Sequence, residues 1–186
     1  MQTFRLGFVG AGFISKFHAK ALTQVRGVDL VGVHALKGAE ELAQYASNHN
    51  LGDCKVDPPV AELCKNCNAM AVFTPKFVRI DIVSEICDAA KVGTALKGVI
   101  CEKPLGRTPC EARKPLEPTK SAGLHMAYFE NQTDMKAGQG RACPVESATE
   151  NDGAAQRLAM GGYTNSVRRK RVTIASLAGP CALCEH

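Results

Sequence analysis

The stretch that decides the fold is residues 7–22, which read GFVGAGFISKFHAKAL. A short apolar run ends at Val9, two glycines follow within three residues, and apolar side chains then recur with helical spacing at Ile14, Phe17 and Ala21. A buried strand, a tight turn and an amphipathic helix give this order of residues. The sequence therefore predicts a strand–turn–helix unit here.

The turn itself, residues 10–15 (GAGFIS), fits the pattern G-x-G-x-x-[G/A] except that serine holds the last position. The first glycine of such a turn permits the bend, and the second lets the backbone approach a pyrophosphate. The N–H groups that open the helix then face the phosphates. Gly10, Gly12, Phe13 and Ile14 are therefore candidate dinucleotide-binding residues. The alternative is a glycine turn that serves only helix–sheet packing.

Strand-like and helix-like segments alternate about five times along the chain. The predicted strands are 4–10, 28–35, 54–56, 68–74, 96–101 and 124–129, and the predicted helices are 13–25, 39–48, 60–65, 77–90 and 110–122. Alternation of this kind indicates right-handed crossovers and a parallel sheet covered on both faces. We expect an α/β fold with a doubly wound, Rossmann-like parallel sheet over residues 1–132, followed by a short irregular tail at 133–186.

The second strand lacks the acid that would bind the ribose hydroxyls of NAD. Such a carboxylate is expected about 20 residues after the glycine turn. The strand instead ends in His34, Ala35, Leu36 and Lys37. Lys37 would pair with a 2′-phosphate, which favours NADP, while a solvated turn lysine is the alternative. The cofactor prediction is therefore NADP or NAD.

Composition excludes several functional classes. The chain has 186 residues, is 45% hydrophobic and 22% charged, and carries a net charge of +5 without a strong local asymmetry. No apolar run approaches the ~18 residues that cross a bilayer, and no secretory pattern opens the chain. Nine cysteines, an odd number without a framework, favour reduced thiols. We expect a cytoplasmic protein with no membrane or nucleic-acid partner and no metal site.

Three stretches together resemble the Gfo/Idh/MocA oxidoreductases (glucose–fructose oxidoreductase, inositol dehydrogenase and relatives). The first is GFVGAGFISKFHAKAL, with His18 after the glycine turn, and the second is AMAVFTPKFVRIDI at residues 69–82. The third and most specific begins GVICEKPLGRTPCEAR at residue 98 and ends KSAGLHMAYFENQ at residue 132. The resemblance covers about residues 3–132.

The resemblance implies a Rossmann domain that binds NAD or NADP, followed by a larger domain that binds a sugar or polyol substrate. It implies that Glu102, Lys103 and Pro104 form the family's Glu-Lys-Pro motif, with Glu102 and Lys103 at the cofactor and Lys103 as the catalytic residue that reaches the substrate hydroxyl or carbonyl. Thr74 and Pro75 would line the nicotinamide side. Two departures, Lys76 and Arg79, stand where the family usually has Asn and His, and they add positive charge near the cofactor.

Residues 133–186 depart from the family. His186 is their one histidine, and they are too few to form the family's second domain. Their composition, with little periodicity, resembles that of a frame-shifted extension. We therefore expect a truncated enzyme that is weakly active or inactive alone and that self-associates through exposed sheet surface. The alternative is a non-catalytic nucleotide-binding or interaction protein. Its basic stretch VRRKRV (167–172), or the two C-x-x-C pairs at 64–67 and 181–184, would serve a partner or a metal.

Overall fold

The structure is a computed structural model, and it describes residues 3–129. The prediction of an irregular tail at 133–186, with its basic stretch and its C-x-x-C pair, lies outside the described residues. In chain order the elements are β1 (Phe4–Val9), α1 (Phe13–Leu22), β2 (Val28–His34), α2 (Ala39–Asn48), β3 (Lys55–Val56), α3 (Val60–Asn66), β4 (Ala69–Val72), α4 (Lys76–Lys91), β5 (Gly98–Glu102), α5 (Pro109–Arg113), α6 (Leu116–Ser121) and β6 (His125–Phe129).

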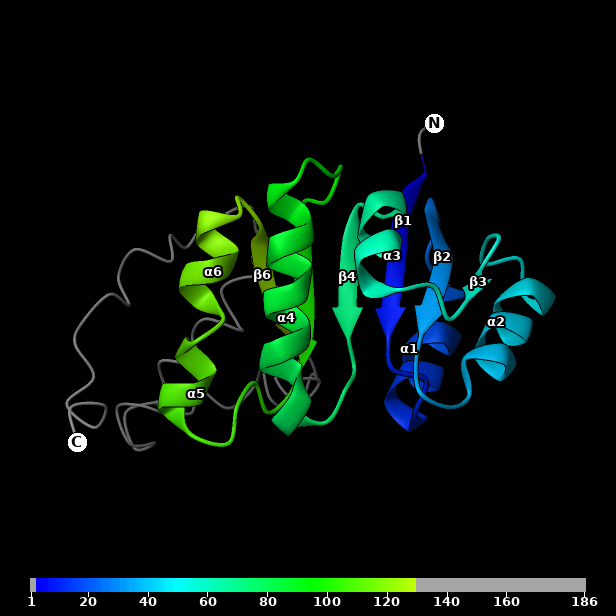
Figure 1. Cartoon of the computed structure of the whole chain (residues 1–186). Helices are drawn as coiled ribbons and strands as arrows, with labels where there is room; N and C mark the ends of the chain where they lie inside the picture. Colours follow the sequence, from blue (N-terminus) through cyan, green and yellow to red (C-terminus); the bar gives the residue numbers. More distant parts are fainter. Residues whose placement is uncertain (1–2, 130–186) are drawn as a thin grey trace, which may run out of the picture.

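All six strands form one sheet in the order β3-β2-β1-β4-β5-β6. Every neighbouring pair runs parallel, so the carboxyl ends of all strands lie at the same edge (Figure 1). The strand order reverses between β1 and β4, because the chain goes outward from β1 to β3 and then returns to start the other half at β4. This arrangement confirms the predicted doubly wound parallel sheet.

Helices cover both faces of the sheet over separate apolar cores. One core joins α3 and α4 to the central strands through buried side chains, among them Leu63, Met70, Val83 and Ile86. The other joins α1 and α2 to the opposite face through Ala19, Leu42, Phe8, Leu30 and others. In Figure 1, α3, α4 and α6 lie in front of the sheet. The two cores hold the strand ends of both halves in fixed positions relative to one another.

The predicted helix at 110–122 is divided in the structure. α5 ends at Arg113 and α6 begins at Leu116, with Pro115 between them. Pro115 has no N–H to continue the hydrogen bonds of α5, and its ring restricts the residue before it. The other predicted elements are present with ends shifted by a few residues, and α2 has the predicted bounds. No helix among the described residues is long and apolar enough to cross a membrane.

Candidate functional site

A cleft of about 710 Å³ opens at the carboxyl edge of the sheet, where the strand order reverses. Residues at four strand ends line it. They are 9–12 and 14 at the end of β1, 34–37 at the end of β2, 73–76, 78, 79 and 82 between β4 and the first turns of α4, and 102–104 at the end of β5. Segments far apart in the sequence thus meet around one hollow. In open α/β sheets, this is the place where ligands bind.

The two glycines of the turn differ in their surroundings. Gly10 has φ +106°, and a Cβ at this position would lie 3.2 Å from the backbone carbon of Phe73. Gly12 has an ordinary φ of −76°, and a Cβ there would meet nothing within 4 Å. Gly10 is therefore required by the fold. Gly12 leaves its backbone open on the cleft side, as the predicted approach of a pyrophosphate requires.

The third small position of the turn is Ser15, which lies in the first turn of α1 and is fully buried. Its Oγ has no hydrogen-bond partner among the described residues. A small side chain at this place lets the helix pack closely on the sheet. Serine therefore meets the steric need of the motif, although it lacks a polar partner.

One end of the cleft is formed by the residues after β2. A carboxylate lies next to this strand end, at the residue after β3: Asp57 Oδ1 is 2.9 Å from His34 Nδ1 and accepts a 3.2 Å hydrogen bond from the N–H of Ala35. Sequence reasoning missed this contact because Asp57 lies beyond a whole helix in the chain. Asp57 does not line the cleft, whereas Lys37 does, and no described residue pairs with the Lys37 ammonium.

The other end of the cleft is held together by Arg79. Its side chain is 4% exposed, and its guanidinium donates to the carbonyl oxygens of Thr74 (2.6 Å), Glu102 and Pro104. The loop after β4 and the loop after β5 are therefore joined through one side chain of α4. Burial lowers the pKa of Arg79, but a guanidinium remains protonated at neutral pH.

The Glu102 carboxylate is engaged on both oxygens. Oε1 lies 3.3 Å from Nε2 of His18, and Oε2 accepts a 2.9 Å hydrogen bond from the backbone N–H of Lys103. The His18 ring packs against both Phe73 and Phe129, with ring centroids 4.7 and 4.3 Å away. The sequence analysis noted His18 only as the histidine after the glycine turn. The structure instead brings it against the acid of the Glu-Lys-Pro segment.

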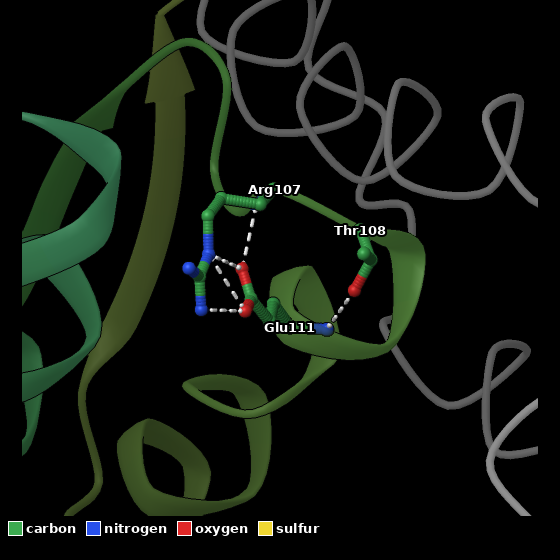
Figure 2. Close-up of polar contacts among 3 residues, drawn as sticks. All are labelled: Arg107, Thr108 and Glu111. Carbon is green, nitrogen blue, oxygen red and sulfur yellow. Dashed lines mark hydrogen bonds and ion pairs between the residues drawn. The ribbon is translucent and has the colours of Figure 1, made fainter.

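A hydrogen-bonded turn closes the loop that carries this segment (Figure 2). Thr108 is the N-cap residue of α5, and its Oγ1 accepts a 3.1 Å hydrogen bond from the N–H of Glu111. The Glu111 carboxylate accepts from the backbone N–H of Arg107 (2.8 Å) and from its guanidinium. A Cβ on Gly106 would lie 2.6 Å from the backbone nitrogen of Ala112, so only glycine fits there without a shift. These contacts explain why Gly106, Arg107 and Thr108 stand in the loop that follows Pro104 and Leu105.

The structure brings nearly all predicted site residues to one cleft. Its lining includes Gly10, Gly12, Ile14, Lys37, Thr74, Pro75, Glu102 and Lys103. Phe13 is not among the lining residues, and its side chain is 82% exposed. Thr74 Oγ1 is buried without a hydrogen-bond partner among the described residues, so it is available to a ligand. Within residues 3–129, no group of three or more His, Cys, Asp or Glu side chains is placed to hold a metal ion.

Comparisons with known proteins agree with this geometry. Residues 4–129 match the Gfo/Idh/MocA family model, described as an oxidoreductase family with an NAD-binding Rossmann fold. The chain is 27% identical over 130 residues to the rhizopine catabolism protein MocA of Rhizobium meliloti, and the match covers 68% of this chain and 37% of that protein.

Two solved structures share the fold. One is UDP-N-acetylglucosamine 3-dehydrogenase GnnA from Acidithiobacillus ferrooxidans, with a TM-score of 0.60 and 23% identity over 75% of this chain and 42% of that chain. The other is GenD2 from gentamicin A biosynthesis in complex with NAD, with a TM-score of 0.58 and 22% identity over 72% of this chain and 36% of that chain. The chain thus spans less than half the length of each of these proteins.

Proposed function

The chain belongs to the Gfo/Idh/MocA oxidoreductase family, whose Rossmann domain binds NAD, and from that premise we propose that residues 3–129 bind NADP or NAD in the cleft at the carboxyl edge of the sheet. The observation that carries this proposal is the glycine turn. Gly12 is open on the cleft side, and the N–H groups at the start of α1 are available to phosphate oxygens there. A bound nicotinamide dinucleotide supplies hydride transfer, which no protein side chain supplies.

The residues present fit such a ligand along the whole cleft. We propose that Gly10, Gly12, Phe13 and Ile14 hold the pyrophosphate, with Phe13 acting through its backbone N–H. The residues after β2 then hold the adenosine half, and those after β4 and β5 hold the nicotinamide half, because the turn lies between them. Thr74 Oγ1, buried without a partner among the described residues, offers a hydrogen bond at the nicotinamide half.

Lys37 is the candidate for choosing between the two cofactors. It lines the adenosine end, pairs with no described residue, and follows a strand end at which the Asp57 carboxylate lies 2.9 Å from His34 Nδ1. An ammonium at this place would attract the 2′-phosphate of NADP, whereas NAD is favoured by a free carboxylate. We therefore propose NADP as the preferred cofactor.

Lys103 is the proposed catalytic residue. It lines the cleft, its side chain is exposed, and its backbone is fixed by the N–H···Oε2 contact with Glu102. From this position the Lys103 ammonium can hydrogen-bond a substrate hydroxyl or carbonyl oxygen and stabilise negative charge on it during proton transfer. Pro75 and Glu102 would complete the wall next to the nicotinamide.

The substrate class is proposed as a sugar or polyol. This rests on the family and on the neighbouring dehydrogenases, one of which is a UDP-N-acetylglucosamine 3-dehydrogenase. We propose that residues 1–132 are the cofactor domain and 133–186 a separate tail, and that substrate turnover by this chain alone is weak. The support is that the matched region corresponds to 37% of the length of the MocA relative.

We also propose that the chain is cytoplasmic and that it self-associates. Five of the six cysteines in residues 3–129, Cys54, Cys64, Cys67, Cys87 and Cys101, carry free thiols, as is usual in a reducing compartment, whereas Cys110 is disulfide-bonded. Large apolar side chains at Phe13, Phe17 and Phe77 are more than half exposed, and such surface favours association. Light scattering tests the second point, since a purely monomeric chain over a wide concentration range contradicts it.

A cofactor titration of the intact chain tests the central proposal. The chain contains no tryptophan, so the fluorescence of NADPH or NADH can be followed without overlapping indole emission. We expect saturable binding with a dissociation constant in the micromolar range, and calorimetry gives the same constant independently. A folded chain that binds neither cofactor at millimolar concentration contradicts the proposal.

A further inference from the structure

The nicotinamide half of the cleft carries an excess of positive charge. Three cationic side chains line it: Lys76 and Arg79 from α4, and Lys103 from the loop after β5. One carboxylate, that of Glu102, lines the same half. Lys76 and Lys103 are exposed, whereas Arg79 is almost fully buried. The Arg79 charge is therefore the least screened by solvent and salt.

Arg79 is a buried cation without a carboxylate partner among the described residues. Its hydrogen-bond acceptors are the backbone carbonyl oxygens of Thr74, Glu102 and Pro104, all of which are neutral. The charge is stabilised by these dipoles but is not cancelled by them. Its field consequently extends to the cleft that Arg79 lines.

The Glu102 carboxylate makes no ion pair with Arg79, although its negative charge acts on Arg79 and offsets part of the positive charge here. Its two oxygens contact His18 Nε2 at 3.3 Å and the backbone N–H of Lys103 at 2.9 Å. The side chain of Glu102 is 12% exposed and that of His18 19%, so this contact is shielded from water. One carboxylate against three cations leaves this half of the cleft positive at neutral pH.

The two redox forms of the cofactor differ in charge at one place only. The oxidised nicotinamide ring carries a positive charge, and the reduced ring is neutral, while the phosphates and the adenosine are the same. A positive environment around the ring therefore opposes binding of the oxidised form and leaves binding of the reduced form unaffected. Charges elsewhere in the cleft act equally on both forms.

From these charges we infer that Arg79, together with Lys76 and Lys103, makes the domain select the reduced dinucleotide, NADPH or NADH, over the oxidised one. The inference rests on the proposed function, because it assigns the strand ends of β4 and β5 to the nicotinamide. Two unit charges about 10 Å apart in a partly buried site change an equilibrium constant by about tenfold. We expect the dissociation constant of the oxidised form to exceed that of the reduced form by about tenfold or more.

Such a preference has a redox consequence. Tighter binding of the reduced form by about tenfold raises the two-electron reduction potential of the bound couple by about 30 mV. The bound oxidised cofactor is then a stronger hydride acceptor than the free one. The direction favoured on the protein is oxidation of a substrate hydroxyl, with slow release of the reduced cofactor.

The test is a pair of calorimetric titrations of the intact chain, with NADPH and with NADP⁺, and its readout is the ratio of the two dissociation constants. Arg79→Gln removes the buried charge, and we expect the ratio to fall towards one. Arg79→Lys keeps the charge and should keep most of the ratio. The double variant Lys76→Gln/Lys103→Gln changes only exposed side chains, so it tests the inference even where Arg79→Gln fails to fold.

Lys37→Gln is the matched control, because it removes one cation from the adenosine end of the same cleft. It should weaken both redox forms by the same factor and leave the ratio unchanged. Equal dissociation constants for the two forms in the wild-type chain overturn the inference, and so does a ratio that survives in every folded charge variant. Absence of binding by both forms overturns the proposed function itself.

Discussion

Substituting Gly12 by valine separates the role of the glycine turn in binding from its role in folding. Gly12 lies at the N-terminal end of α1 with φ −76°, and a Cβ there would meet no protein atom within 4 Å. The fold therefore accepts the side chain. Valine is a poorer N-cap residue than glycine, so the expected loss of folding free energy is about 1 kcal/mol or less.

The effect on binding should be much larger. The new side chain occupies the open side of the turn, where a pyrophosphate would approach the backbone. A hydrogen bond from a backbone N–H to a charged phosphate oxygen is worth about 1.5–3 kcal/mol. Loss of two such bonds amounts to about 3 kcal/mol or more, which raises the dissociation constant by about a hundredfold or more.

Gly10→Val provides the contrasting variant in the same turn. Its φ of +106° is unfavourable for any side chain, and the Cβ would lie 3.2 Å from the backbone of Phe73. We expect it to destabilise the fold by about 2 kcal/mol or more. Thermal unfolding and NADPH titration of both variants provide the measurements. A Gly12→Val chain that keeps its melting temperature and binds NADPH as tightly as wild type refutes the assignment of the turn to the pyrophosphate.

Three further outcomes are expected. Lys37→Met should raise the dissociation constant of NADPH by about tenfold and leave that of NADH nearly unchanged, and equal effects on both would contradict 2′-phosphate recognition. Thr108→Ala removes the side-chain cap of α5 (Figure 2) and should cost about 1 kcal/mol in chemical unfolding, whereas Thr108→Ser should cost less. Burial raises the pKa of the Cys64, Cys67 and Cys101 thiols from 9.0 to about 12. When the native protein is treated with an alkylating reagent at pH 8, these three thiols should therefore react slowly. Mass spectrometry of the digested protein should find the peptides that contain them unmodified. Because the unfolded chain loses these thiol protons first, the free energy of unfolding in reductant should be steady below pH 9 and fall as the pH rises towards 12.

The sequence predicted the sheet and the glycine turn because both depend on local patterns. Apolar runs of strand length alternate with segments of helical period. Few arrangements other than a parallel sheet with helical crossovers bury the apolar residues of such an alternation. The position of the cleft followed from the same pattern, since parallel strands bring their carboxyl ends to one edge. Gly12 and Lys37 were predicted from this pattern, whereas Thr74 and Lys103 were predicted from the resemblance to the family, and all four line the cleft.

What the sequence did not reveal are contacts between residues far apart in the chain. The contact of Asp57 with His34 joins the residue after β3 to the end of β2, and that of His18 with Glu102 joins α1 to β5. Neither pair has a spacing that a periodic pattern would reveal. Arg79 was noted as an added charge, but its three carbonyl partners lie on two loops whose distance depends on the packing of α4.

The hydrogen bonds of Arg79 join the loops after β4 and β5, so substitutions in the two halves of the cleft should affect cofactor binding differently. Changes in the Thr74 loop and in the Glu102–Pro104 loop act on the same guanidinium, so their effects on binding should be non-additive. The strand end that carries Lys37 has no hydrogen bond to this guanidinium among the described residues. The preference between NADP and NAD can therefore be altered by substitutions at the end of β2 alone. Substitutions next to the nicotinamide have to be optimised together.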